Sequence, residues 1–206
     1  MPQRNPEPAC LRCRSPNSAI GRRTALAGAV GLLSTGVAAR SSFAQIPSDA
    51  ERARPQAGDV LVKMVGDDRR PLTVADLPVG DKPIIAWPFD PATGTLRSAS
   101  RLNKVLVLRL DPEGFDEPTR ADAADGVLAY SAICPHTGCE VANWQAEAQI
   151  LECPCHFSHY DPKAGAKVLS GPSPRRLAAL PLSAAEGGKL VVAKPFTGRV
   201  GVQQQT

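Results

Sequence analysis

The sequence predicts an all-β fold of antiparallel strands, and its composition and residue pattern both indicate it. Among 206 residues, 17 are glycine and 20 are proline, a content that suits a loop-rich β protein better than a helical bundle. Short runs rich in Val, Ile and Leu recur between Gly, Pro and Asp, and no long amphipathic helix or internal repeat is evident. We therefore expect one antiparallel β domain with a smaller, loop-built subdomain inserted in it.

Residues 1–44 have the pattern of an export signal. A polar, basic stretch ends in Arg22-Arg23, an uncharged apolar stretch covers residues 24–39, and Ser42-Phe43-Ala44 offers a small-residue cleavage site. The string Gly-Arg-Arg-Thr-Ala-Leu resembles a twin-arginine signal, which directs the export of folded proteins. We expect a twin-arginine signal peptide over residues 1–44 and a periplasmic mature protein.

The alternative is a leader retained as a membrane anchor. Residues 24–39 would span about 24 Å as a helix, short of the roughly 30 Å of a hydrocarbon core. Membrane association follows only if this leader is kept. Cys10 and Cys13 form a C-x-x-C ahead of the apolar stretch, so we expect both to be absent from the mature protein.

The positive charge of the chain belongs to the leader. Residues 1–44 hold six arginines and one acid, whereas residues 45–206 hold 18 basic and 19 acidic side chains. A nucleic-acid-binding domain would need a basic face, so we expect no nucleic-acid partner. We expect residues 45–57 to be a flexible N-terminal segment and residues 58–206 to form the domain, with the inserted subdomain at about 133–174.

Seven strands are expected from the apolar runs, at residues 60–65, 83–87, 104–110, 126–132, 150–152, 166–169 and 189–193. In the third run, Val105 and Val107 alternate with Leu106 and Leu108, which predicts a strand with one well-buried face. Residues 111–125 are charged and contain Pro and Gly, so they predict a surface loop.

The residues that carry chemistry lie between positions 134 and 159. The motifs C-x-H-x-x-C, starting at Cys134, and C-x-C-H, starting at Cys153, are separated by thirteen residues. Four of the six cysteines and all three histidines fall in this stretch. One interpretation is a structural zinc ion on four of these side chains, which would make the chain a zinc-stapled binding module. The other is a two-iron cluster held by two cysteines and two histidines, which leaves one cysteine of each motif over.

The two motifs resemble those of the Rieske family, in its disulfide-containing branch. The resemblance implies one [2Fe–2S] cluster per chain, with four ligands: Cys134 and Cys153 on one iron, His136 and His156 on the other. It implies a disulfide between Cys139 and Cys155, and a fold of three small antiparallel sheets with a cluster-binding subdomain. Residues 170–174 are similar to the family's proline loop, which covers the cluster. His159 has no ligand position, so we expect it at the surface or behind the ligands.

Such a centre carries single electrons. Two ferric ions, two sulfides and two thiolates sum to zero charge, so adding an electron costs less than in an all-thiolate cluster, and Rieske potentials lie at roughly −150 to +300 mV. The resemblance also implies that Ser158 and Tyr160 tune the potential by donating hydrogen bonds to a bridging sulfide and to the Cys134 sulfur. We expect an electron-transfer subunit of an oxidoreductase complex with no catalytic residue of its own.

Three histidines are too few for a Rieske oxygenase, which needs a further iron site. The chain resembles the small subunit of arsenite oxidase in its leader and its Cys-Pro-Cys-His-Phe-Ser string. It resembles the Rieske subunit of cytochrome bc complexes in Ser158, Tyr160 and the Gly-Pro-x-Pro loop, although Phe157 stands where those proteins usually have Gly. The first resemblance implies a larger redox partner of molybdopterin type, with a cytochrome c or cupredoxin as acceptor, and we favour it over the bc-type subunit.

Overall fold

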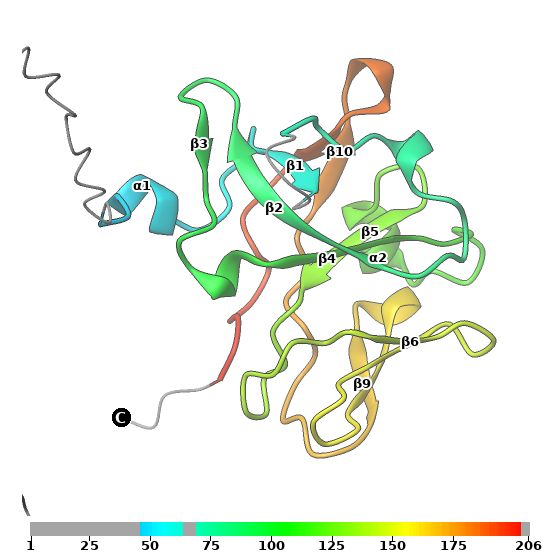
Figure 1. Ribbon diagram of the computed structural model, residues 1–206. Helices are drawn as coiled ribbons and strands as arrows, with labels where there is room; N and C mark the ends of the chain where they lie inside the picture. Colours follow the sequence, from blue (N-terminus) through cyan, green and yellow to red (C-terminus); the bar gives the residue numbers. More distant parts are fainter. Residues whose placement is uncertain (1–45, 64–68, 203–206) are drawn as a thin grey trace, which may run out of the picture. The chain divides into compact units, whose positions relative to one another are not determined.

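A computed structural model describes residues 46–63 and 69–202 of the chain (Figure 1). Its larger sheet is antiparallel, with strands in the order β10-β11-β1-β2-β4-β5 and β3 paired to β2. The strands of this sheet are β1 (Val60–Lys63), β2 (Ile84–Asp90), β3 (Thr95–Leu96), β4 (Val105–Arg109), β5 (Val127–Ser131), β10 (Leu182–Ala184) and β11 (Leu190–Val192). The smaller sheet pairs β6 (Asn143–Gln145), β7 (Ile150–Glu152), β8 (His159–Asp161) and β9 (Lys167–Ser170) in chain order. The all-β antiparallel class is thus confirmed.

The described residues form two sheets where three were expected. The larger sheet curls until its two ends meet, because the residues just before β10 pair with β5: Ser131 N donates to Ala178 O at 2.8 Å and Leu180 N to Ala129 O at 2.9 Å. These bonds and the β1–β2 pairing join strands that would otherwise form two separate sheets.

The central strands are buried on both faces, which corrects the prediction of one buried face for β4. Val105 and Val107 point into a core inside the large sheet, while Leu106 and Leu108 point into a second core. This second core also contains Tyr160 and the cysteines Cys134 and Cys153 of the two motifs. Because β4 has apolar side chains on both faces, the large sheet supports its own interior and the subdomain beside it.

All seven expected strands are present with slightly shifted ends; only residues 64 and 65 of the first run lie outside the described part. The sequence did not predict β3, β6, β8 and β10, which are two or three residues long. The short helices were also missed: α1 (Asp49–Arg52), α2 (Glu117–Asp122), η1 (Val74–Asp76), η2 (Arg101–Asn103), η3 (Pro162–Ala164) and η4 (Glu186–Gly188).

Two of these helices lie in segments for which the sequence predicted no regular structure. Helix α2 occupies the expected surface loop 111–125, because Asp116 caps its first turn by accepting from Thr119 N and Pro118 suits the start of a helix. Helix α1 lies in the segment expected to be flexible, residues 45–57. That segment has tertiary contacts, since Asn103 Nδ2 donates to Ala53 O at 2.7 Å.

The expected signal peptide, with Cys10, Cys13 and the Arg22-Arg23 pair, lies outside the described residues. Within the described ranges, none of the helices has the length and apolar character that crossing a bilayer requires.

Candidate metal centre

The two cysteine motifs fold into loops of the same construction. In the first, Gly138 N donates to Cys134 O at 3.0 Å; in the second, Phe157 N donates to Cys153 O at 3.0 Å. Each loop therefore reverses over five residues, and the fifth has positive φ, +83° at Gly138 and +55° at Phe157. Glycine adopts this backbone freely, whereas a bulky residue rarely does. Phe157 adopts it here all the same, and this residue is 63% exposed.

Two cysteine thiols and two imidazoles face each other across these loops. Cys134 and Cys153 are buried and carry no disulfide. Burial raises the pKa of the Cys153 thiol. The rings of His136 and His156 meet edge to face with centroids 4.7 Å apart. His136 is half-buried and His156 exposed, so both histidines are more accessible to solvent than the two buried cysteines.

This donor set fits a [2Fe–2S] cluster of the mixed cysteine–histidine kind. His136 Nδ1 is buried and has no hydrogen-bond partner, which is costly for a ring nitrogen unless something binds it there. Cys134 and Cys153 add two buried sulfur donors that no disulfide uses, and a cysteine thiolate is a metal ligand. The structure thus brings the two predicted histidines into contact, buries the two predicted thiols and leaves His136 Nδ1 without a partner.

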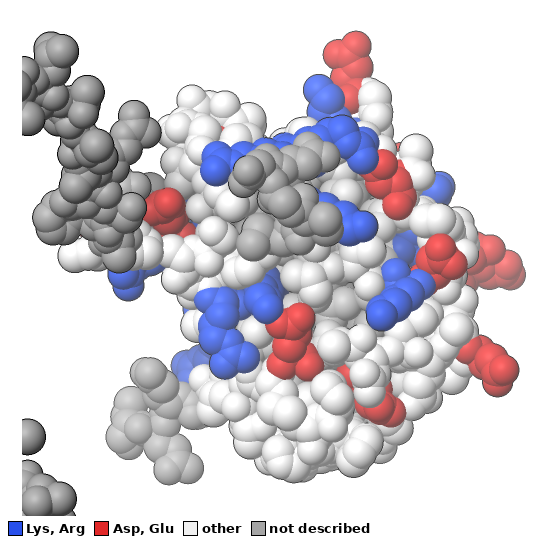
Figure 2. Space-filling model, in the orientation of Figure 1, with Lys and Arg blue, Asp and Glu red and all other residues white. Residues whose placement is uncertain are grey.

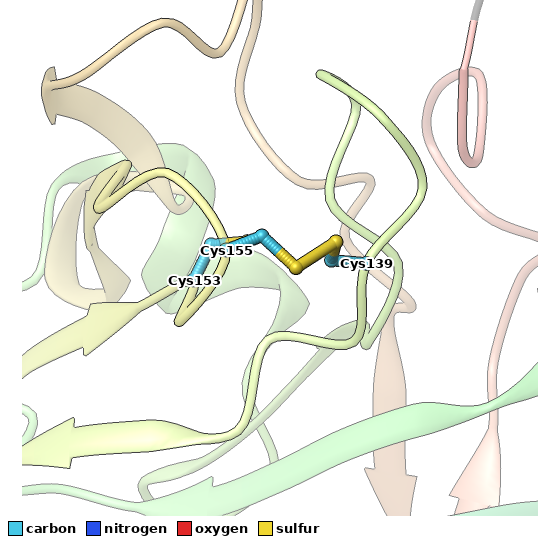
Figure 3. Close-up of side chains that lie close together, drawn as sticks. All are labelled: Cys139, Cys153 and Cys155. Carbon is cyan, nitrogen blue, oxygen red and sulfur yellow. A yellow bond between two sulfur atoms is a disulfide. The ribbon is translucent and has the colours of Figure 1, made fainter. Parts of the chain in front are cut away.

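The predicted disulfide between Cys139 and Cys155 is confirmed (Figure 3). It links the last residue of the first motif to the exposed part of the second loop. The Sγ atoms of Cys139, Cys153 and Cys155 all lie within 4.8 Å of one another. Two of these three sulfurs are joined to each other, so of this group only Cys153 can supply a thiolate to a metal.

Tyr160 lies directly behind the first thiol. Its hydroxyl oxygen is 3.1 Å from Cys134 Sγ in a buried contact, so the contact implied by the resemblance is present. Burial, and secondly the neighbouring Cys134, raise the pKa of Tyr160. The phenol therefore keeps its proton and can donate it to a cysteine thiolate. Tyr160 belongs to β8, whose pairing with β7 holds it in place.

Ser158 and the loop at 170–174 form one packed unit. Ser173 N donates to Ser158 Oγ at 3.1 Å in a buried hydrogen bond, and the hydroxyl hydrogen of Ser158 is left to donate elsewhere. Gly171 has a φ of +89°, and a Cβ there would lie 2.5 Å from Ser158 Cα. Only glycine fits such an approach, so the proline loop rests directly on the backbone of the second motif.

The sequence did not predict the contacts of His159. Its Nε2 lies 2.9 Å from Glu152 Oε2, and its Nδ1 lies 3.0 Å from Ser170 Oγ. Hydrogen bonds from Asn143, then from His159 and Gln145, lower the pKa of Glu152. His159 thus connects the residue before Cys153 to the first residue of the proline loop. No sequence signal identified these partners, because the strand pairing alone brings them together.

Figure 2 shows one face with few charged side chains near the smaller sheet. Below β6 and β9 in Figure 1, the same view of the space-filling surface in Figure 2 is largely free of Lys, Arg, Asp and Glu. An uncharged surface of this kind suits close contact with another protein without desolvating ions.

Comparison with known proteins agrees with this site. Residues 90–181 match the model of the Rieske [2Fe-2S] domain. A Haloferax mediterranei protein, described as a respiratory nitrate reductase Rieske subunit, is 45% identical over 97 residues, which cover 47% of this chain and 43% of that protein.

Two relatives are described as Rieske iron–sulfur subunits of cytochrome bc1 complexes. The one from Streptomyces lividans is 31% identical over 98 residues, covering 47% of this chain and 58% of the relative. The one from Corynebacterium diphtheriae is 41% identical over 104 residues, covering 48% and 26%. The matches span less than two thirds of each relative's length.

Proposed function

Because residues 90–181 are a Rieske [2Fe–2S] domain in an electron-transfer protein, we propose that the chain is the exported, periplasmic electron-transfer subunit of an arsenite-oxidase-like oxidoreductase. The observation that carries the electron-transfer role is the state of the four predicted ligands: two buried thiols without a disulfide, and two imidazoles in contact, one of which has a buried Nδ1 without a partner. When bound to these residues, the cluster takes up and releases one electron.

The residues around the ligands provide the conditions for that exchange. The Cys134 and Cys153 side lies in the core, which excludes water from the thiolates. The His156 side reaches the surface, so an electron has a short path to a partner there. A hydrogen bond donated by the Tyr160 hydroxyl to Cys134 Sγ stabilises negative charge on that sulfur. Such a hydrogen bond favours the reduced state of the cluster.

Export to the periplasm is supported by the disulfide. A bond between Cys139 and Cys155 persists in an oxidising compartment and is rare in a reducing cytosol. We propose that the twin-arginine leader carries the folded chain there. Replacing Arg22-Arg23 with Lys-Lys should leave the precursor in the cytoplasm, which fractionation and immunoblotting measure. Mature-length protein in the periplasm of that variant would contradict the export route.

We propose a larger subunit of molybdopterin type as the partner, with a cytochrome c or cupredoxin as acceptor. Affinity purification of the chain from its own cells tests this proposal. A molybdopterin-containing subunit should co-purify in stoichiometric amount, and the complex should reduce the acceptor only when the chain carries iron. Iron-loaded chain that neither binds a larger subunit nor passes electrons to either acceptor would contradict it.

The second candidate is the Rieske subunit of a cytochrome bc-type complex. The Tyr160–Cys134 contact and the packing of Ser158 under the proline loop favour it, as do the relatives described as bc1 subunits. Co-purification of a cytochrome b, together with quinol-dependent cytochrome c reduction, would select this candidate and reject the first.

A further inference from the structure

One free thiol lies beside the disulfide. Figure 3 shows Cys153 next to the bonded pair Cys139 and Cys155, and all three Sγ atoms lie within 4.8 Å of one another. Cys153 has no disulfide of its own. A thiolate within a few ångströms of a disulfide sulfur is placed for thiol–disulfide exchange, whose rate depends on access to that sulfur.

We propose that Cys153, when iron does not hold it, exchanges with the Cys139–Cys155 disulfide, so that the chain must receive its cluster before this disulfide closes. The inference rests on the proposed role of Cys153 as an iron ligand. It adds an order of assembly: cluster insertion comes first and oxidation of the spare cysteines second.

The exchange consumes neither oxidant nor reductant. The Cys153 thiolate attacks Cys139 Sγ, a 139–153 bond forms, and the 139–155 bond breaks with its electron pair on Cys155 Sγ. That sulfur then takes up the proton that Cys153 released. The number of disulfides stays at one and the number of free thiols in the two loops stays at two, but the thiols are now Cys134 and Cys155.

Attack at Cys139 is favoured over attack at Cys155. A bond from Cys153 to Cys155 would close a small ring across Pro154, whose φ is fixed. A bond from Cys153 to Cys139 keeps the two loops joined. It also makes the exposed Cys155 the leaving group, and water can stabilise the departing thiolate there. The product still has a disulfide between the two loops, but Cys153 is no longer available as an iron ligand.

An iron-bound Cys153 sulfur is not available for this attack, so a loaded chain keeps the correct disulfide. A chain oxidised while empty can settle into the 139–153 form and can no longer complete the ligand set. Export of an already folded, loaded protein avoids that outcome, which gives a chemical reason for a twin-arginine leader on this chain.

The test starts from the iron-loaded protein. Iron is removed anaerobically with a chelator at neutral pH, the protein is held for increasing times, and free thiols are then labelled with N-ethylmaleimide in denaturant. After cleavage following Glu152, fragmentation at the Cys153–Pro154 bond assigns each label to Cys153 or Cys155. We expect the Cys155 label to rise at least tenfold over the loaded protein, while two labels per chain persist in the two loops.

Reconstitution gives a second readout. Stripped protein held for hours should take up iron and sulfide several-fold less well than freshly stripped protein, and a dithiol reductant should restore uptake. A Cys155→Ser variant has no disulfide to attack, so its uptake of iron and sulfide should not fall during anaerobic incubation. If that variant fails to fold, the label positions in the unmodified protein still decide the question.

Two results would overturn the exchange. One is a label that stays on Cys153 with the 139–155 bond unchanged after long incubation. The other is a loss of both labels, which means oxidation of Cys134 and Cys153 to each other instead of exchange. Purified protein without any iron would instead count against the proposed function, so the two failures are distinguishable.

Discussion

The large sheet and the small sheet of this protein are held together in different ways. Strands β4 and β5 of the large sheet are buried on both faces, and apolar packing is sufficient to define them. Strands β6 to β9 are three or four residues long and largely half-exposed. Their region is held by a few individual contacts: a disulfide, the Glu152–His159–Ser170 hydrogen bonds and the packing of Gly171 against Ser158. The difference suggests that the cluster region can be damaged while the large sheet survives.

The largest expected effect is loss of a ligand. His136→Ala should give colourless protein without a Rieske EPR signal, because His136 is one of the four proposed ligands and its Nδ1 has no protein partner. The far-UV circular dichroism should keep most of the β signal, since the large sheet has its own core. A normal Rieske EPR signal in this variant would refute the ligand assignment.

Leu61→Ala tests the other region. Leu61 is fully buried in the core inside the large sheet, so its truncation should lower the free energy of unfolding by about 2–5 kcal/mol. The reduction potential should stay unchanged, because that core does not include the ligands. Denaturant unfolding and protein-film voltammetry measure the two quantities. A shift in potential would show that the regions are coupled more closely than the packing indicates.

Removal of the disulfide acts on the small sheet alone. The bridge spans 16 positions, and for a loop of about 15 residues the chain-entropy model predicts ~3 kcal/mol. Cys139→Ser should therefore speed cluster release into a chelator and raise amide exchange in β6 to β9, with little change in β4 and β5. Hydrogen exchange read by mass spectrometry locates the effect; uniform loosening of both sheets would argue against separate stabilisation.

Two hydroxyl groups, of Tyr160 and Ser158, should tune the reduction potential. Tyr160→Phe removes the hydroxyl 3.1 Å from Cys134 Sγ, and Ser158→Ala removes the hydroxyl whose hydrogen we expect to be donated to the cluster while its oxygen accepts from Ser173 N. Each should lower the reduction potential, because donated hydrogen bonds stabilise the reduced state more. The two shifts should add approximately in the double variant. Voltammetry with an unchanged potential in both single variants would leave cluster charge and solvent exposure as the determinants.

The smallest effect is expected where α2 meets the subdomain. Hydrogen bonds from Thr119 lower the pKa of Asp116, so its stabilisation is fully present above the ordinary value of about 3.9 and is lost as pH falls through the lower folded value. Asp116→Ala should cost about 1 kcal/mol near pH 7, and this difference should shrink on acidification below that window. Paired unfolding curves of both proteins across pH measure it; a constant difference would exclude the carboxylate as its source.

The amino-acid sequence by itself predicted which residues carry the chemistry. Cys134, His136, Cys153 and His156 stand at spacings that few other sites use, and the Cys139–Cys155 bond followed from the same motifs. The longer apolar runs also predicted their strands, because apolar residues bounded by turn-forming ones act locally. The export leader stays a prediction, since it lies outside the described residues.

The tertiary structure alone decided how these parts meet. Closure of the large sheet, burial of β4 on both faces and the partners of His159 depend on strands far apart in the sequence, so no local pattern reports them. The positive φ of Phe157 is imposed by the loop, against the residue's own preference. The proximity of Cys153 to the disulfide has the same origin, because a disulfide and a thiol become neighbours only when both loops are folded onto one core.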